Sequence, residues 1–308
     1  MKKILVVAIS LSALSPAAFA DDATCAKIKS ADLGWTDIAI TTNTAAVILK
    51  SLGYQMDNTL LGLTVSYEAL KNNDQDIFMG NWRPAQDVEF APYYDQKQVE
   101  VLNTNLEGAK YTLAVPAYAA DAGVKSFDDL AKFADKFGKK IYGIEPGSNL
   151  PLLDMVAAGT HGLAGWEIVE SSEVGMMTEV KKSINKGEWI AFLAWQPHPM
   201  NVDFKITYLA GGDAEFGPDF GGATVRTISR VGYAAQCPNA AKFFSNLVFD
   251  IDYENIAMRK VTTDGLSPEA AATDMMKQHP EKLAGWLNGV TTIDGKPGLD
   301  AVKAELGL

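Results

Sequence analysis

The chain has 308 residues, of which 47% are hydrophobic and 21% are charged, and its formal net charge at pH 7 is −11. This length suffices for two domains, or one large domain, with sizeable cores. The excess of negative charge argues against nucleic acid and anionic membrane surfaces as partners, since both are themselves anionic. A cationic small molecule is compatible with it.

Residues 1–20 have the pattern of a cleaved signal peptide. Lys2 and Lys3 form a basic start, residues 4–14 an apolar run, and residues 18–20 an A-x-A-like cleavage site. The alternative is a membrane anchor, but the apolar run is too short to cross a bilayer ~30 Å thick. We therefore expect export to the periplasm as a soluble protein.

Two cysteines, Cys25 and Cys237, remain in the expected mature chain. Because the periplasm is oxidising, the sequence favours a disulfide between them. The alternative is two unpaired buried thiols. Pairing would place both ends of the chain in one domain.

The first third of the chain alternates strands and helices. We expect strands at 26–35, 60–65 and 76–80, a helix from Thr36 or Asp37 to Gly53, and a short helix at 67–72. This order predicts a parallel sheet covered by helices. In such sheets ligands lie beyond the carboxyl ends of strands, where Trp35 and Trp82 fall.

The rest of the chain predicts a second α/β unit and a helical end. Expected strands are 111–116, 140–144, 167–171, 189–195 and 224–233; expected helices are 127–139, 150–160, 174–186, 238–250, 253–262, 267–279 and 280–287; residues 211–222 form a long loop. The fold class is therefore α/β with two lobes: lobe I comprises 21–112 and 228–308, and lobe II comprises 113–227. The chain crosses between lobes near 111–115 and 224–230, and two such crossovers make a hinge that can enclose a ligand.

Signatures of catalysis are missing from the sequence. It contains no Gly-x-Ser-x-Gly, no His-Glu-x-x-His, no phosphate-binding loop and no Cys-x-x-Cys. His161, His198 and His279 lie far apart without metal-ligand spacing. We expect no enzyme, no metal and no cofactor. A periplasmic hydrolase is a less favoured alternative, because it would need a nucleophile–base pair.

Three of the six tryptophans stand apart from the others. Trp35, Trp82 and Trp195 each follow a strand and precede a polar or proline-bearing turn, where side chains face a cleft. The core is the expected place for the remaining three: Trp166, Trp189 and Trp286. Several aromatic faces around one point suit a quaternary ammonium, because this cation lacks N–H donors and is held by ring quadrupoles instead.

Six segments together carry a resemblance to a known family. They are Gly-Trp-Thr-Asp-Ile (34–38), Gly-Asn-Trp-x-Pro (80–84), Gly-Ala-Lys-Tyr-Thr-Leu-Ala (108–114), Tyr-Gly-Ile-Glu-Pro-Gly (142–147), Trp-x-Pro-His-Pro-Met (195–200) and Thr-Tyr-Leu-x-Gly-Gly-Asp (207–213). With them the chain resembles the periplasmic choline-binding proteins of bacterial ABC importers, within the wider glycine betaine substrate-binding family. The resemblance covers essentially the whole mature chain.

The resemblance implies a set of ligand-binding residues. The implied aromatic box around the trimethylammonium group of choline consists of Trp35, Trp82, Tyr111 and Trp195. Asp37 would accept a hydrogen bond from the choline hydroxyl. Where the family has an asparagine directly after Glu-Pro-Gly, this chain has Ser148, with Asn149 next. Either residue is therefore a candidate for the hydroxyl end.

The resemblance also implies partners and pairings. The paired cysteines of the family match Cys25 and Cys237, and family members deliver their ligand to an inner-membrane ABC permease. We expect a monomer that closes its lobes around the ligand.

Asp37 discriminates between ligands on electrostatic grounds. Choline offers a hydroxyl donor and no negative charge, whereas the carboxylate of glycine betaine would repel Asp37 in a dry cleft. The sequence therefore ranks choline first, with glycine betaine or another quaternary amine as the alternative. A purely structural role for Asp37, accepting the free N–H groups of a helix start, competes with both.

Overall fold

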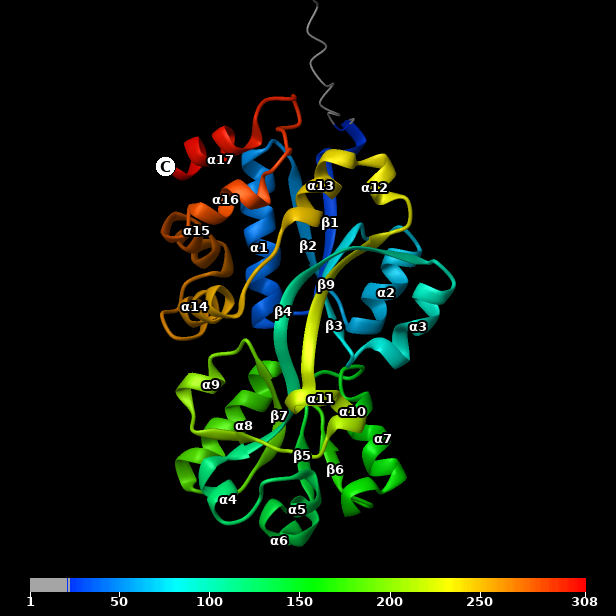
Figure 1. Cartoon of the computed structure of the whole chain (residues 1–308), viewed down its shortest axis with the longest axis vertical. Coiled ribbons are helices and arrows are strands. Elements are labelled where there is room, and N and C mark those ends of the chain that lie inside the picture. Colours follow the sequence, from blue (N-terminus) through cyan, green and yellow to red (C-terminus); the bar gives the residue numbers. More distant parts are fainter. Residues whose placement is uncertain (1–20, 22) are drawn as a thin grey trace, which may run out of the picture.

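The protein is an elongated α/β molecule of two lobes, described by a computed structural model for residue 21 and residues 23–308 (Figure 1). Lobe I, at the top of Figure 1, holds β1–β3 and the helices near both ends of the chain. Lobe II, at the bottom, holds β5–β8. The predicted two-lobed α/β fold is confirmed. The predicted signal peptide lies outside the described residues.

The strands form one mixed sheet in the order β2-β1-β3-β9-β4-β7-β5-β6, with β8 paired to β4. Their bounds are β1 Lys27–Asp32, β2 Gln55–Leu60, β3 Ile77–Arg83, β4 Val99–Pro116, β5 Lys140–Tyr142, β6 Glu167–Val169, β7 Ala191–Gln196, β8 Ile206–Tyr208 and β9 Gly222–Arg230. β1 is parallel to β2 and β3, and β5 is parallel to β6 and β7. Each lobe therefore has the predicted parallel core.

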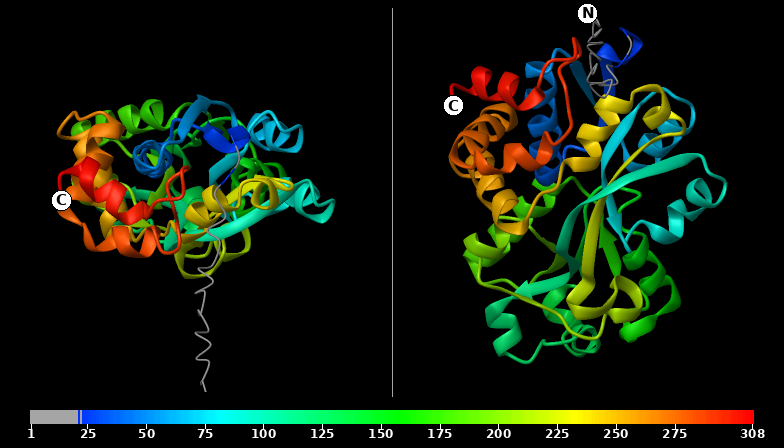
Figure 2. Two further views of the ribbon diagram at one scale, coloured as in Figure 1. Left: turned by 90° about the horizontal axis from the view of Figure 1, so that it is seen from above. Right: turned by 45° about the horizontal axis from the view of Figure 1, so that its top comes forward.

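Helices cover both sides of these strands. Their bounds are α1 Thr36–Ser51, α2 Leu63–Lys71, α3 Asp87–Asp95, α4 Ala117–Asp121, α5 Phe127–Lys132, α6 Ala134–Phe137, α7 Leu150–Ala158, α8 Glu173–Lys186, α9 Met200–Asp203, α10 Asp213–Phe216, α11 Pro218–Gly221, α12 Tyr233–Gln236, α13 Pro238–Asn246, α14 Ile251–Thr262, α15 Pro268–Gln278, α16 Glu281–Trp286 and α17 Gly298–Leu306, with short 3-10 helices at Ala23–Ala26 and Thr160–Gly162. In lobe I, α1 packs with α14, α15 and α17 on one side, and α2 and α3 lie on the other (Figures 1 and 2). Among the residues described, none of these helices has the length and apolarity needed to span a bilayer.

Several expected elements have different bounds in the structure. The strand expected at 60–65 is instead β2, Gln55–Leu60, and residues 63–65 begin α2. β2 is an edge strand whose side chains are mostly exposed. Its sequence therefore lacks the alternation of apolar and polar residues by which strands are predicted. The helix expected at 127–139 is divided at Phe133 into α5 and α6.

Other elements are absent from the sequence prediction. α3, α17, β8 and the first half of β4 were not expected, and the expected loop 211–222 contains the short helices α10 and α11. Gly221 in α11 has a φ of +72°, and a Cβ there would lie 2.0 Å from the carbonyl oxygen of Tyr111. Only glycine fits this close approach, which sets α11 against β4.

β4 and β9 are the strands that pass from one lobe to the other (Figure 1). They pair antiparallel from Val99 opposite Arg230 to Lys110 opposite Gly222. The lobe boundaries at 112/113 and 227/228 stay a prediction, and both fall within β4 and β9.

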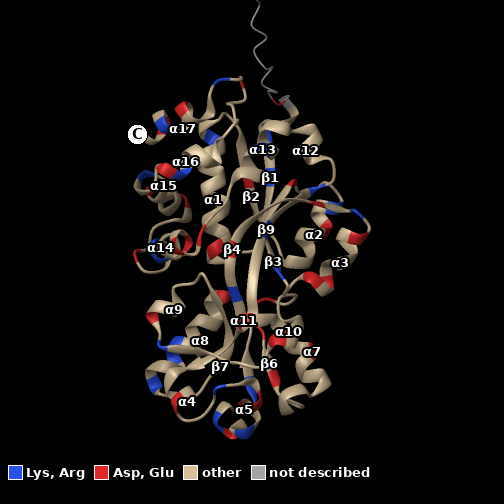
Figure 3. Cartoon of the chain, viewed as in Figure 1, with Lys and Arg blue, Asp and Glu red and all other residues tan. Residues whose placement is uncertain are grey.

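Charged residues of both signs are distributed over the helices of the two lobes (Figure 3).

Both ends of the chain are fastened to lobe I. The predicted disulfide between Cys25 and Cys237 is present, with 5.6 Å between the Cα atoms. Next to it the carboxylate of Asp21 accepts hydrogen bonds from the N–H groups of Asn239 (2.8 Å) and Ala240 (2.9 Å) at the start of α13. The N-terminal strand and the C-terminal helices thus form one unit.

Removing the disulfide should destabilise the protein without weakening ligand binding. The bond closes a loop with a sequence separation of 212 residues, and removal of such a cross-link typically costs ~2–5 kcal/mol. We expect the Cys25→Ala/Cys237→Ala variant to lose stability of this order in urea unfolding. Wild-type stability, or a loss of ligand affinity that exceeds the loss of folded protein, would contradict this.

Candidate functional site

A cavity lies between the two lobes. Most of the residues that line it are aromatic or aliphatic. The full lining consists of Trp35, Asp37, Leu63, Trp82, Ala85, Gln86, Tyr111, Ile144, Gly147, Ser148 and Trp195. Both lobes therefore contribute to the wall of the cavity.

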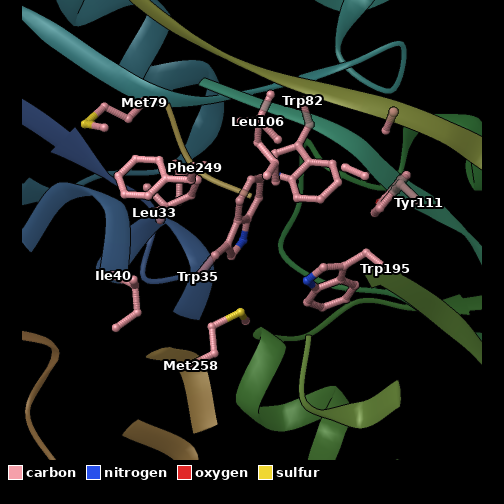
Figure 4. Close-up of a cluster of buried hydrophobic side chains, with 14 of the residues drawn as sticks. Leu33, Trp35, Ile40, Met79, Trp82, Leu106, Tyr111, Trp195, Phe249 and Met258 are labelled. Carbon is pink, nitrogen blue, oxygen red and sulfur yellow. The ribbon is translucent and has the colours of Figure 1, made fainter. Parts of the chain in front are cut away.

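The four rings named from the sequence come together here (Figure 4). Trp35 follows β1 and precedes α1, Trp82 lies in β3, and Tyr111 and Trp195 lie opposite each other in the β4–β7 pair. The ring centroids of Trp82 and Tyr111 are 6.3 Å apart, with an angle of 51° between the ring planes. Strands distant in the sequence thus present aromatic faces to one space.

The polar atoms of three rings are fixed by hydrogen bonds. Trp35 Nε1 donates to Glu145 Oε2 at 2.8 Å, Trp82 Nε1 to Asp37 Oδ2 at 3.1 Å, and the Tyr111 hydroxyl to the carbonyl oxygen of Ser148 at 2.9 Å. With these donors satisfied, the ring faces are what remains to interact with a ligand. Trp195 is oriented by an edge contact with the His198 ring, at 4.9 Å between centroids.

Asp37 is a buried carboxyl with an unused oxygen. Its side chain lies in the first turn of α1, and the residue is 2% exposed. Oδ2 accepts from Trp82, whereas Oδ1 is buried and has no hydrogen-bond partner in the described part of the chain. The N-cap of α1 is Trp35, and the first N–H of the helix, that of Thr36, is satisfied by Glu173. Asp37 is therefore not the N-cap residue of this helix, although the N–H of Ile38 in the first turn lies close enough to favour its carboxylate.

Burial and, second to it, the negative charge of Glu173 together raise the pKa of Asp37 to about 7. The backbone N–H of Ile38 and the indole N–H of Trp82 oppose this rise, because both favour the carboxylate. A cation in the cavity would favour the ionised form of Asp37 as well.

Ser148 and Asn149 have different surroundings. Ser148 lines the cavity, and its buried hydroxyl has no hydrogen-bond partner among the described residues. The Asn149 side chain instead holds its own loop: Oδ1 accepts from the N–H of Ile144 (2.9 Å), and Nδ2 donates to the Ile144 carbonyl oxygen (2.8 Å) and to Glu170 Oε1 (2.8 Å). Only Ser148 has a polar atom available to a ligand.

Sequence reasoning missed the acidic residues behind the rings. Glu145 and Glu173 contact the Trp35–Thr36 corner from lobe II, and buried His198 contacts Glu173 Oε1 through Nε2 at 3.2 Å. The sequence gives no spacing that links these positions. Within residues 21 and 23–308, no group of three or more His, Cys, Asp or Glu is arranged to hold a metal ion.

The profile of a known family covers most of the chain. Residues 26–278 match the substrate binding domain of the ABC-type glycine betaine transport system. The chain belongs to this family. Its members are extracellular or periplasmic binding proteins of ABC importers rather than enzymes, as predicted.

Solved structures of binding proteins are similar to this chain. An ABC-transporter choline binding protein in complex with choline is 50% identical, with a TM-score of 0.91 over 92% of this chain and 99% of that one. The same kind of protein in an unliganded semi-closed conformation is also 50% identical and covers 92% of this chain and all of that one, but its TM-score is 0.85. Lactococcal OpuAC, closed around glycine betaine, is 26% identical, with a TM-score of 0.76 over 84% of this chain and 98% of that one. The lobes here are thus arranged more like those of the choline complex than those of the unliganded form.

Burial of the Asp37 carboxyl should lower the free energy of unfolding of the protein. The pKa of Asp37 lies above its unfolded value, so the folded state binds more protons between these values and loses stability as pH rises from ~4 to ~7. We expect Asp37→Asn to stabilise the ligand-free protein at pH 8 by up to about 4 kcal/mol, the equivalent of a carboxyl pKa moved from 3.8 to about 7.

Urea unfolding of both proteins at pH 5 and pH 8 measures this effect. The stability difference should widen at the higher pH. Asp264→Asn, on the exposed surface, is the matched control and should show no such change. A difference for Asp37→Asn that is equal at both pH values would contradict the assignment.

Proposed function

We propose that this protein is a periplasmic solute-binding protein that captures choline between its lobes and delivers it to an ABC permease in the inner membrane. The observation that carries the proposal is a cavity faced by four aromatic rings, with the unpartnered Oδ1 of Asp37 on its wall. The 50% identity to a choline binding protein supports the same ligand.

The chemistry of the cavity suits both ends of choline. A trimethylammonium group has no N–H donor, and each ring face contributes ~1–2 kcal/mol to such a cation in a desolvated site. Trp35, Trp82, Tyr111 and Trp195 together then supply much of the roughly 8 kcal/mol of micromolar binding. The choline hydroxyl donates to Asp37 Oδ1. The hydroxyl of Ser148, rather than the amide of Asn149, completes the contacts at this end.

Glycine betaine is the second candidate. The family profile and the lactococcal structure point to it. Its carboxylate would meet the ionised carboxylate of Asp37, and two like charges a few Å apart in a dry cleft repel strongly. A protonated Asp37 would instead donate to that carboxylate, so glycine betaine binding is favoured by low pH, where Asp37 is protonated. Choline is therefore the better ligand at neutral and higher pH.

The proposal also covers export, lobe closure and cofactors. Residues 1–20 direct export and are cleaved. The protein acts as a monomer in which lobe I (21–112 and 228–308) and lobe II (113–227) close about β4 and β9, and no cofactor takes part. A periplasmic hydrolase on this scaffold is disfavoured by the family to which the chain belongs.

Calorimetric titration at pH 8 tests the choice of ligand. Choline should bind to the mature protein with micromolar or tighter affinity and at least tenfold more tightly than glycine betaine, because only glycine betaine places a second carboxylate beside Asp37. Carnitine and trimethylamine N-oxide complete the screen. Tighter binding of glycine betaine would overturn the proposal.

Ring removal tests the aromatic box. Trp195→Ala and Trp82→Ala should each weaken choline binding roughly tenfold or more, about the contribution of one ring. Trp189→Ala is the matched control, since Trp189 packs on Phe133 and Phe137 away from the cavity. Equal affinities for all three variants would reduce the box to ordinary core packing.

A further inference from the structure

Two helices begin at opposite sides of the cleft. α1 of lobe I begins at Thr36, directly after Trp35, and α8 of lobe II begins at Glu173. A helix N-terminus carries partial positive charge and free N–H groups. Two such ends facing each other would repel unless negative groups lay between them.

Two glutamates of lobe II occupy this position. Glu145 Oε1 accepts from the N–H of Glu173 at 3.1 Å, and Glu145 Oε2 accepts from Trp35 Nε1 at 2.8 Å. Glu173 Oε2 accepts from the N–H of Thr36 at 3.0 Å, and its Oε1 accepts from the Thr36 hydroxyl at 2.5 Å. All four carboxylate oxygens are therefore engaged, three of these four donors belong to Trp35 and Thr36 of lobe I, and the pair bridges both helix ends.

We propose that Glu145 and Glu173 are positioning residues of the choline site, which clamp the Trp35–Thr36 corner of lobe I onto lobe II when the lobes close. This inference rests on the proposed function. It adds two residues outside the aromatic box, whose hydrogen bonds hold the two lobes together and fix the ring plane of Trp35.

The clamp acts on Trp35 through its single polar atom. An indole has one N–H donor, so a hydrogen bond to a fixed carboxylate selects the direction of the ring. Glu145 is itself fixed by the first N–H of α8. Glutamine at this position has only one oxygen for two donors, so either Trp35 or the helix end would lose its partner.

Glu173 has a second effect through its charge. It faces Asp37 closely enough to raise the pKa of that carboxyl. Glu254 of α14 also faces Asp37, and burial together with the charge of Asp37 raises the pKa of Glu254. The imidazole of His198 donates its Nε2–H to Glu173, because its Nδ1 accepts from the N–H of Met200 at 3.0 Å. Loss of the charge of Glu173 should therefore make Asp37 easier to ionise.

The two glutamates are thus distinguishable by experiment. Choline dissociation rates are measured by stopped-flow tryptophan fluorescence for wild type, Glu145→Gln and Glu173→Gln between pH 5.5 and pH 8.5. Both variants should release choline about tenfold faster or more, since breaking a partly buried charge-assisted hydrogen bond acts mainly on dissociation. The pH at which choline affinity is half-maximal should move to lower pH in Glu173→Gln and stay in place in Glu145→Gln.

Controls separate the clamp from general effects of charge and folding. Glu179→Gln removes an exposed charge from the same helix, where Glu179 pairs with Lys182, and should match wild type. Thr36→Val removes one donor to Glu173 from the other lobe, keeps both glutamates, and should release choline several-fold faster. It serves as the test if a glutamate variant does not fold.

Wild-type dissociation rates in the glutamate variants, or in Thr36→Val where those do not fold, would overturn the clamp. An unshifted pH midpoint in Glu173→Gln would overturn its effect on Asp37. If wild type itself does not bind choline, the proposed function fails, and the clamp is judged separately by small-angle scattering without ligand. The Glu145→Gln/Glu173→Gln variant should then have a larger radius of gyration than wild type, and an equal radius would overturn the clamp.

Discussion

The buried carboxyl group of Asp37 constrains the cleft more than any other group. Burial between the lobes costs this group its hydration, and one of its oxygens has no partner in the described part of the chain. A cation beside it relieves both problems, because it favours the charged form and its hydroxyl fills the vacant acceptor. The rings of Trp35, Trp82 and Tyr111 can hold such a cation without competing for Oδ1, since their own donors are bound to Glu145, to Asp37 Oδ2 and to Ser148. The burial of Asp37 therefore favours a cationic ligand.

The cavity is built from residues of both lobes. Trp35, Asp37 and Trp82 come from lobe I, Trp195 and Ser148 from lobe II, and Tyr111 from β4, which runs through both. None of these elements can complete the cavity alone. The flanking glutamates then fasten the corner that carries Trp35, so ligand capture and lobe contact reinforce each other.

The two-lobed fold and the aromatic residues of the cavity could be predicted from the sequence. Strands that end in aromatic residues before prolines or polar turns mark a cleft, so the rings and the α/β lobes were predicted. The position of β2 was predicted wrongly because an exposed edge strand needs no alternation of apolar and polar residues. Glu145 and Glu173 escaped because their partners are a backbone N–H, a hydroxyl and an indole N–H from another lobe, and no sequence spacing records such a contact. The choice between Ser148 and Asn149 required the loop geometry.

The structure of the mature protein crystallised with choline at pH 8 tests the central claim most directly. The trimethylammonium group should contact the faces of Trp35, Trp82, Tyr111 and Trp195, and the choline hydroxyl should lie within hydrogen-bond distance of Asp37 Oδ1. A choline molecule bound outside these rings, or one whose hydroxyl points away from Asp37, would contradict it.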